Sequence, residues 1–201
     1  MSVDATDENE VVEKASDELA RLRDIVESRW VMALATHDPH DPASPYPTPL
    51  FFSAARRESF GGAAGVALVF SSDPRSRHGQ QLGAGPTRAA AAVYLETEEI
   101  GALRGAQLRG TVWRADTLDA RAPGIQAGLL RSYLDRHPVA ASAFEKARPP
   151  SLYLFEVIWA KITDNRLGFG THPIWEAARG AWTAPSISAT VLGAEKGEHE
   201  R

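Results

Sequence analysis

Six short apolar runs, separated by turn residues, constrain the fold of this 201-residue chain more than any other feature. Each run has the length of a β-strand, and glycine, proline and aspartate are frequent in the segments between them. The predicted strands are residues 30–36, 48–53, 66–71, 88–95, 107–113 and 152–162. Because most of them follow one another in meander order, we expect an α+β, mainly β protein with a largely antiparallel sheet or small barrel.

Segments with helical periodicity precede and separate these runs. A helix is expected from Ser16, as its cap, to Arg29, and two more are expected at 124–136 and 139–147, separated by Pro138. The buried face of the first helix is expected to consist of Leu19, Leu22, Ile25 and Val26.

The segment 37–46, dense in proline and aspartate, is expected to be a loop because proline cannot donate to a sheet ladder. Pro47 and Pro49 place the start of the second strand at an edge or a bulge. We divide the chain into an acidic, disordered leader (1–15), one domain (16–182) and a loosely ordered tail (183–201).

Composition excludes several classes of function. The 22 basic and 26 acidic residues give a net charge of −4, which does not favour nucleic acid or an anionic membrane surface as a partner. The absence of cysteine excludes disulfides, thiolate zinc sites and a cysteine nucleophile. With no signal core and no apolar stretch of about 20 residues, we expect a soluble, cytoplasmic protein. The cluster His37–Asp41 resembles a metal-binding motif, but such a proline-rich loop also gathers polar residues without a metal, and no metal site is expected.

The strand at 66–71 leads into hydroxyl groups and a basic turn, a combination that suits a phosphate. Ser71 and Ser72 precede Asp73-Pro74, and the cluster Arg75-Ser76-Arg77-His78 opens a short helix that ends near Gly83. Hydroxyls, backbone N–H groups and guanidinium groups all bind a dianion. The other interpretation is an ordinary helix cap at Ser72 or Asp73 with both arginines in water, and the residues alone leave both open.

Gln107 also allows two interpretations. On its strand it either faces inward as a buried amide that needs partners, or faces solvent beside Arg109. A serine hydrolase is not expected, because the chain has no G-x-S-x-G elbow. A dinucleotide-binding loop is not expected either, because Gly168-Phe169-Gly170 lacks the third glycine of that motif.

Taken together, these segments resemble the pyridoxamine 5′-phosphate oxidase-like, FMN-binding split-barrel family, in a less-characterised branch of small proteins. The resemblance rests on the order and spacing of Phe70–Gly79, Leu82 to Pro86, Gln107–Val112, and Ile162–Gly170 with Trp175. It implies a six-stranded antiparallel split β-barrel with flanking helices. It also implies a homodimer that binds FMN in a pocket at the subunit interface.

Individual roles follow from the same resemblance. It implies that Ser71, Ser76 and Arg77 hold the FMN phosphate, with His78 where the oxidase has lysine, and that Gln107 lies at the polar edge of the isoalloxazine ring. The complete set of implied cofactor-binding residues is Thr48, Leu50, Phe70, Ser71, Ser72, Ser76, Arg77, His78, Gln107 and Trp175. No catalytic acid or base is identified.

The implied activity is flavin-dependent transfer of hydride or electrons to a small-molecule acceptor. Oxidation of vitamin B6 is not expected, because Trp175 is followed by Glu176-Ala-Ala where the oxidase has an Arg-x-His element. Three alternatives stay open: a deazaflavin (F420)-dependent reductase on the same fold, a non-catalytic flavin- or haem-binding sensor or storage protein, and an interaction domain with an empty pocket.

Overall fold

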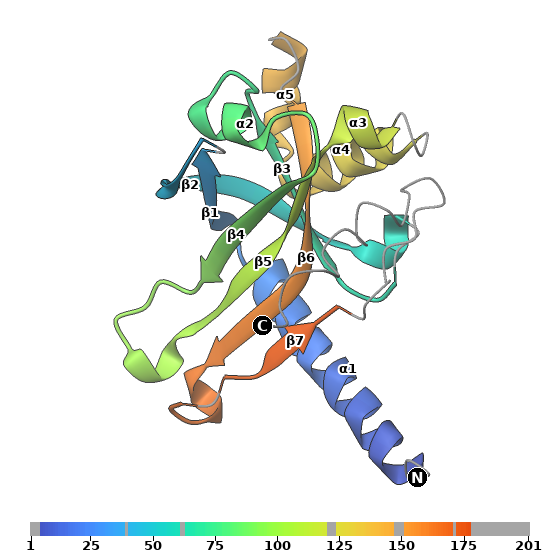
Figure 1. Ribbon diagram of the computed structural model, residues 1–201, viewed down its shortest axis with the longest axis vertical. Coiled ribbons are helices and arrows are strands. Elements are labelled where there is room, and N and C mark those ends of the chain that lie inside the picture. Colours follow the sequence, from blue (N-terminus) through green and yellow to red (C-terminus); the bar gives the residue numbers. More distant parts are fainter. Residues whose placement is uncertain are drawn as a thin grey trace.

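Seven antiparallel strands form one sheet, and five α-helices surround it in the part of the chain that the structure describes (Figure 1). This computed structural model describes residues 5–38, 40–60, 63–119, 124–146, 151–170 and 172–177. The strands are β1 Val31–Asp38, β2 Asp41–Arg56, β3 Val66–Ser72, β4 Thr87–Tyr94, β5 Arg104–Arg114, β6 Ser151–Asp164 and β7 Ile174–Glu176. The helices are α1 Ala5–Glu27, α2 Arg77–Leu82, α3 Ala115–Asp119, α4 Ile125–Arg136 and α5 Val139–Lys146.

Strand pairing closes six of the strands into a ring. The order β3-β2-β1-β4-β5-β6 is joined at its ends, because β3 also pairs with β6. The mainly β, α+β class and the antiparallel pairing are confirmed. The strand count differs from the expected six, because the short strand β7 adds to β6 opposite Trp159–Lys161. A three-residue strand carries too little periodicity to be recognised from sequence.

The prediction of a loop at 37–46 is wrong. Strand β2 begins at Asp41, and His37 pairs with Pro45 on the neighbouring strand β1. Up to Phe51, β2 pairs with β1 alone, and β3 joins it from Phe52 onward. Successive residues of a strand direct their N–H groups to opposite sides, so prolines at 45, 47 and 49, spaced two apart, all lack a donor on the same side. The free side of an edge strand tolerates this, and the predicted edge position of Pro47 and Pro49 is confirmed.

Two hydrophobic clusters lie on opposite faces of the sheet. The first contains residues of α1 and of the six ring strands, including the expected Leu19, Leu22, Ile25 and Val26. The second joins the outer faces of β3 and β6 to α3 and α4, whose buried members are Ala115, Leu118, Leu129 and Tyr133, and α5 packs against it. In Figure 1 these three helices lie at the upper part of the sheet, whereas α1 extends from its lower part.

Helix α1 begins at Ala5, so Ser16 lies inside the helix rather than at its cap. The segment before Ser16 contains no proline or glycine and several glutamates, which favour helix, and the expected disordered leader is therefore helical from residue 5. The tail expected at 183–201, and the domain end at 182, lie outside the described residues. The helices expected at 124–136 and 139–147 correspond to α4 and α5.

Ion pairs fix α1 to the sheet. Arg104 bonds both Asp24 of α1, at 2.5 Å, and Asp164 at the end of β6, at 3.1 Å. Arg166 first, and Arg104 with it, hold the pKa of Asp164 down at about 2, so this carboxylate stays ionised through ordinary pH. Among the described helices, none combines the length and the apolar character that crossing a bilayer requires.

Candidate functional site

The turn between β3 and α2 is organised around Ser76, which is the N-cap of α2. Its hydroxyl donates to the carbonyl oxygen of Asp73 (2.6 Å) and accepts from the N–H of Gly79 (3.2 Å). The helix ends at Gly83, whose φ of 61° is readily adopted by glycine. The cap is therefore Ser76, not Ser72 or Asp73 as the simpler sequence interpretation had it.

Three of the expected phosphate-binding side chains converge at this turn. The Ser72 hydroxyl lies 2.6 Å from Nε2 of His78, and the Ser76 hydroxyl lies 3.3 Å from the same nitrogen. The two hydroxyls are 3.3 Å apart. Burial lowers the pKa of His78, which favours the neutral imidazole, and its Nε2 shares a hydrogen bond with the Ser72 hydroxyl. The cluster can therefore exchange these internal bonds for bonds to an anion.

Arg77 of α2 and Thr48 of β2 add a cationic group and a hydroxyl without a hydrogen-bond partner in the described structure. The exposed guanidinium of Arg77 stacks over the ring of Tyr46 on β2, 4.7 Å from its centroid. Two residues along the same face of β2, the hydroxyl oxygen of Thr48 is buried without a hydrogen-bond partner in the described structure. Thr36 of β1 is bonded to Gln81 of α2 at 2.6 Å, which fixes α2 to this end of the sheet.

Other expected ligands are not gathered at the turn. Ser71 directs its side chain to the face opposite that of Ser72, because adjacent strand residues alternate. Phe70 is fully buried and stacks on Tyr153, with ring centroids 5.1 Å apart. Leu50 packs against the first core cluster, and Trp175 is a buried member of it. The side chains of these last three residues serve the core.

Gln107 is exposed on the outer face of β5, which is the solvent-facing alternative of the two considered. It pairs with Ala92 of β4, and Ala92 in turn pairs with Ala33 of β1. Its neighbour on the same face, Arg109, stacks over Trp159 at 3.9 Å. These contacts of Gln107 and Arg109 do not involve the β3–α2 turn.

The His37–Asp41 segment contains exposed imidazoles and a local turn. The Asp38 carboxylate accepts from the backbone N–H of His40 at 2.8 Å. Within the described ranges, no group of three or more histidine, aspartate or glutamate side chains is arranged to hold a metal ion.

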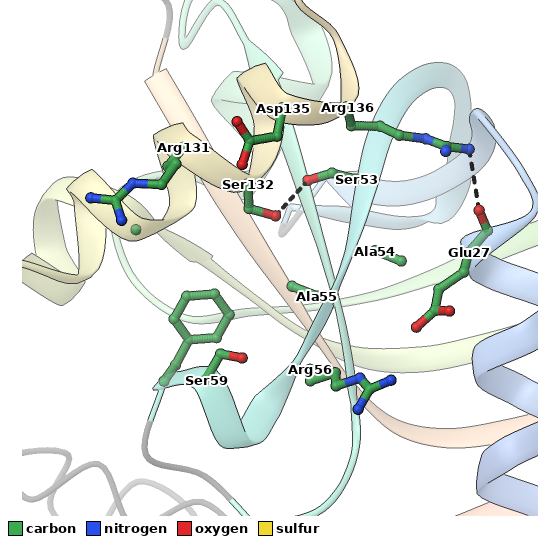
Figure 2. A pocket seen from close by; sticks show the side chains of 12 residues that line it. Glu27, Ser53, Ala54, Ala55, Arg56, Ser59, Arg131, Ser132, Asp135 and Arg136 are labelled. Carbon is green, nitrogen blue, oxygen red and sulfur yellow. Dashed lines mark hydrogen bonds between the residues drawn. The ribbon is translucent and has the colours of Figure 1, made fainter.

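A second feature, a groove of about 590 Å³, lies away from this turn (Figure 2). It is formed by β2, the 3-10 helix Arg57–Phe60, α4 and the end of α1. Its lining residues are Glu27, Ser53, Ala54, Ala55, Arg56, Ser59, Phe60, Gly128, Arg131, Ser132, Asp135 and Arg136. The groove is not recognisable in the sequence, because its charged members have the pattern of any solvated helix face and only the packing of α4 against β2 brings them together.

Comparison with curated proteins places the chain in a family. The UPF0306 protein YhbP of Salmonella paratyphi C is 30% identical to it over 113 residues, which cover 56% of this chain and 69% of that protein. The chain belongs to the YhbP (UPF0306) family. The YhbP protein of Salmonella choleraesuis matches this family member to the same extent. No protein-family profile matches the chain.

Solved structures share the fold of this YhbP-family chain. A heme-binding protein from Mycobacterium smegmatis superposes with a TM-score of 0.58 at 22% identity, over 81% of this chain and 57% of that one. The chain thus spans little more than half the length of that structure. Rv2991, a conserved hypothetical protein from Mycobacterium tuberculosis, gives a TM-score of 0.54 at 16% identity, over 76% of this chain and 88% of that one.

Proposed function

We propose that this chain is an FMN-binding protein of the split-barrel class that works as a flavin-dependent oxidoreductase on a small-molecule acceptor. The proposal rests on one observation above all, the convergence of Ser72, Ser76 and His78 beside Arg77 at the β3–α2 turn. Hydroxyl, imidazole and guanidinium groups donate to the oxygens of a phosphate monoester, and a guanidinium adds a charge-assisted bond.

The residues present fit a phosphate at this turn. The hydroxyl of Ser72 would donate to its oxygens, and the hydroxyl of Ser76 would donate to them in place of the Asp73 carbonyl. His78 would take up a proton and donate from Nε2. Arg77 is the exposed first residue of α2 and would supply the counter-charge. The unsatisfied hydroxyl of Thr48 is a further group that a polar ligand can bond. Ser72 replaces Ser71 in the proposed phosphate set, because its hydroxyl points into the cluster.

The location of Gln107 favours a homodimer. Gln107 is exposed on the outer face of β5, where it is open to a second copy of the chain. A second copy that offers its Gln107 face to the turn of the first would complete the pocket. We therefore propose that FMN lies between two subunits.

Bound FMN would supply a ring that accepts or gives a hydride or single electrons. The chain's own residues would bind the phosphate, orient the ring and exclude water from it. We assign no catalytic acid or base. The electron acceptor is proposed only as a small molecule that reaches the pocket at the interface.

Haem is the second candidate ligand, since the Mycobacterium smegmatis protein with the same fold is a heme-binding protein. The absorption spectrum of the purified protein distinguishes the candidates, because flavin, deazaflavin and haem have different visible bands. A haem spectrum with no bound flavin would replace the FMN proposal.

Arg77→Ala tests the proposed phosphate site. We expect FMN affinity to fall about 10- to 100-fold, the effect of losing a charge-assisted hydrogen bond. Arg75→Ala is the matched control, because Arg75 is an exposed arginine of the same turn that pairs with Asp73. The affinities of the two variants for FMN and for riboflavin, which lacks the phosphate, are measured by titration followed by flavin fluorescence. If Arg77→Ala binds FMN as tightly as the Arg75→Ala variant does, the turn does not hold the phosphate.

A further inference from the structure

The groove between α4 and β2 carries charges of both signs on its walls. Arg131 and Asp135 lie on α4, Arg56 lies on β2, and Glu27 lies at the end of α1 (Figure 2). In this view the carboxylate of Glu27 points into the space between α1 and β2. The groove therefore carries one cation and one anion on α4, a cation on β2 and an anion on α1, and all four side chains are exposed.

None of these four side chains has an ion pair or hydrogen bond within the described structure, although opposite charges elsewhere do pair. Arg131 and Asp135 are spaced four residues apart on a helix, where such a pair can form. By contrast, ion pairs of 2.5–2.7 Å form at Arg23–Glu58, Arg104–Asp24, Arg114–Asp116 and Arg166–Asp164. The groove thus keeps two guanidinium groups and two carboxylates available to a ligand.

The fifth charged residue of the groove, Arg136, is already engaged. Its guanidinium donates to the carbonyl oxygens of Glu27 and Arg29, both at 3.2 Å, and stacks over Trp30 at 3.5 Å. Arg136 therefore closes the end of α1 onto α4 and fixes the width of the groove. Its guanidinium is therefore not among the groups that would contact a ligand.

The floor of the groove consists of small residues and is partly apolar. Ala54, Ala55 and Gly128 leave it open, and Phe60 supplies an aromatic surface. The hydroxyls of Ser53 and Ser132, 3.1 Å apart, join β2 to α4 beneath the charged groups. Its volume of about 590 Å³ lies within the range of small-molecule sites, roughly 300–1,000 Å³.

We propose that this groove binds a small zwitterion, of the class of short peptides with a free ammonium and a free carboxylate. A purely anionic ligand would meet Asp135 and Glu27, and a purely cationic one would meet Arg131 and Arg56, so each would face like charges. A zwitterion offers its carboxylate to a guanidinium and its ammonium to a carboxylate, with an apolar side chain against Phe60. The site is separate from the proposed FMN pocket and does not depend on it.

Isothermal titration with the dipeptide Ala-Phe tests the proposal on the full chain. We expect saturable binding that weakens at least tenfold when the dipeptide is N-acetylated, and again when its carboxylate is amidated. Arg131→Gln and Asp135→Asn are each expected to weaken Ala-Phe binding five- to tenfold. Arg21→Gln and Glu99→Gln, exposed charges outside the groove, are the matched controls and should bind as the unaltered chain does.

Four results would overturn the assignment: no binding of Ala-Phe, equal binding of the blocked dipeptides, unaltered binding by both groove variants, or stronger binding of succinate or phosphate than of Ala-Phe. Thermal unfolding of every variant shows that each is folded. FMN titration of Arg131→Gln gives the second readout, and its FMN affinity should equal that of the unaltered chain. If the dipeptide does not bind, the flavin proposal therefore still stands. If FMN does not bind, the zwitterion proposal still stands.

Discussion

His78 is the residue at which stability and the proposed phosphate site are coupled. Its imidazole is buried against Ser72 and Ser76, and burial lowers its pKa. In the unfolded chain an ordinary histidine pKa is about 6.5. As the pH falls below that value the unfolded state takes up a proton that the folded state resists, so His78 makes the free energy of unfolding decrease toward acid.

We predict that the ligand-free protein loses thermal stability between pH 7.5 and 5.5, and that His78→Asn loses less over the same interval. The measurement is the melting temperature at each pH, with His40→Asn, an exposed histidine, as the control. Equal pH slopes for His78→Asn and the unaltered chain would mean that His78 is free to protonate in the folded state.

At the residue scale, the sequence predicted the composition of the turn better than its geometry. Ser76, Arg77 and His78 are adjacent in the chain, so one helix start holds them together whatever the rest of the fold does. Whether Ser71 or Ser72 joins them depends on which face of β3 is inward, and a nearly continuous apolar strand carries no alternation that reveals this. The unsatisfied Thr48 hydroxyl also depends on distant packing.

At the scale of elements, the pairing of β5 with β6 depends on one glycine. The register shifts between Arg109 and Gly110, and a Cβ at Gly110 would overlap the carbonyl oxygen of Glu156 on the neighbouring strand. The two backbones approach this closely only because residue 110 has no side chain. The approach lies in the middle of the most extensive strand pair of the ring.

Gly110→Ala should therefore destabilise the fold by about 3 kcal/mol, because a strand must move to admit the methyl group. For a domain of this size the melting temperature would fall on the order of 10 °C. Gly101→Ala is the control, since a Cβ there meets nothing within 4 Å. Calorimetry of the two variants measures the difference, and similar melting temperatures would show that β5 and β6 separate at little cost.

The elements themselves were largely predictable, for a physical reason. Five of the seven strands and both later helices combine a clear apolar pattern with turn residues at their ends. One exception is the three-residue strand β7, and the other is β2, where prolines at 45, 47 and 49 indicate a loop if each is judged alone. Their spacing of two residues is compatible with an edge strand, but the absence of a neighbour on that side is a property of the folded sheet.

At the scale of the whole molecule, the proposed pocket couples cofactor binding to assembly. If FMN contacts two subunits, adding it must favour the dimer and raise the melting temperature together. At 100 times its dissociation constant a ligand adds about 2.7 kcal/mol of stability, which corresponds to a rise of roughly 5–10 °C. Light scattering and thermal unfolding with and without FMN measure the two effects, and a flavin-loaded monomer would contradict the interface pocket.

The proline-bearing edge of β2 limits how two copies can meet. An open strand edge ordinarily offers N–H groups to a strand of another molecule, which extends the sheet. Here every second donor is missing over the stretch from Pro45 to Pro49, so a continuous intermolecular ladder cannot form along it. Any association through this side must rely on side-chain contacts, and the chain is protected there from the edge-to-edge stacking that leads to fibrils.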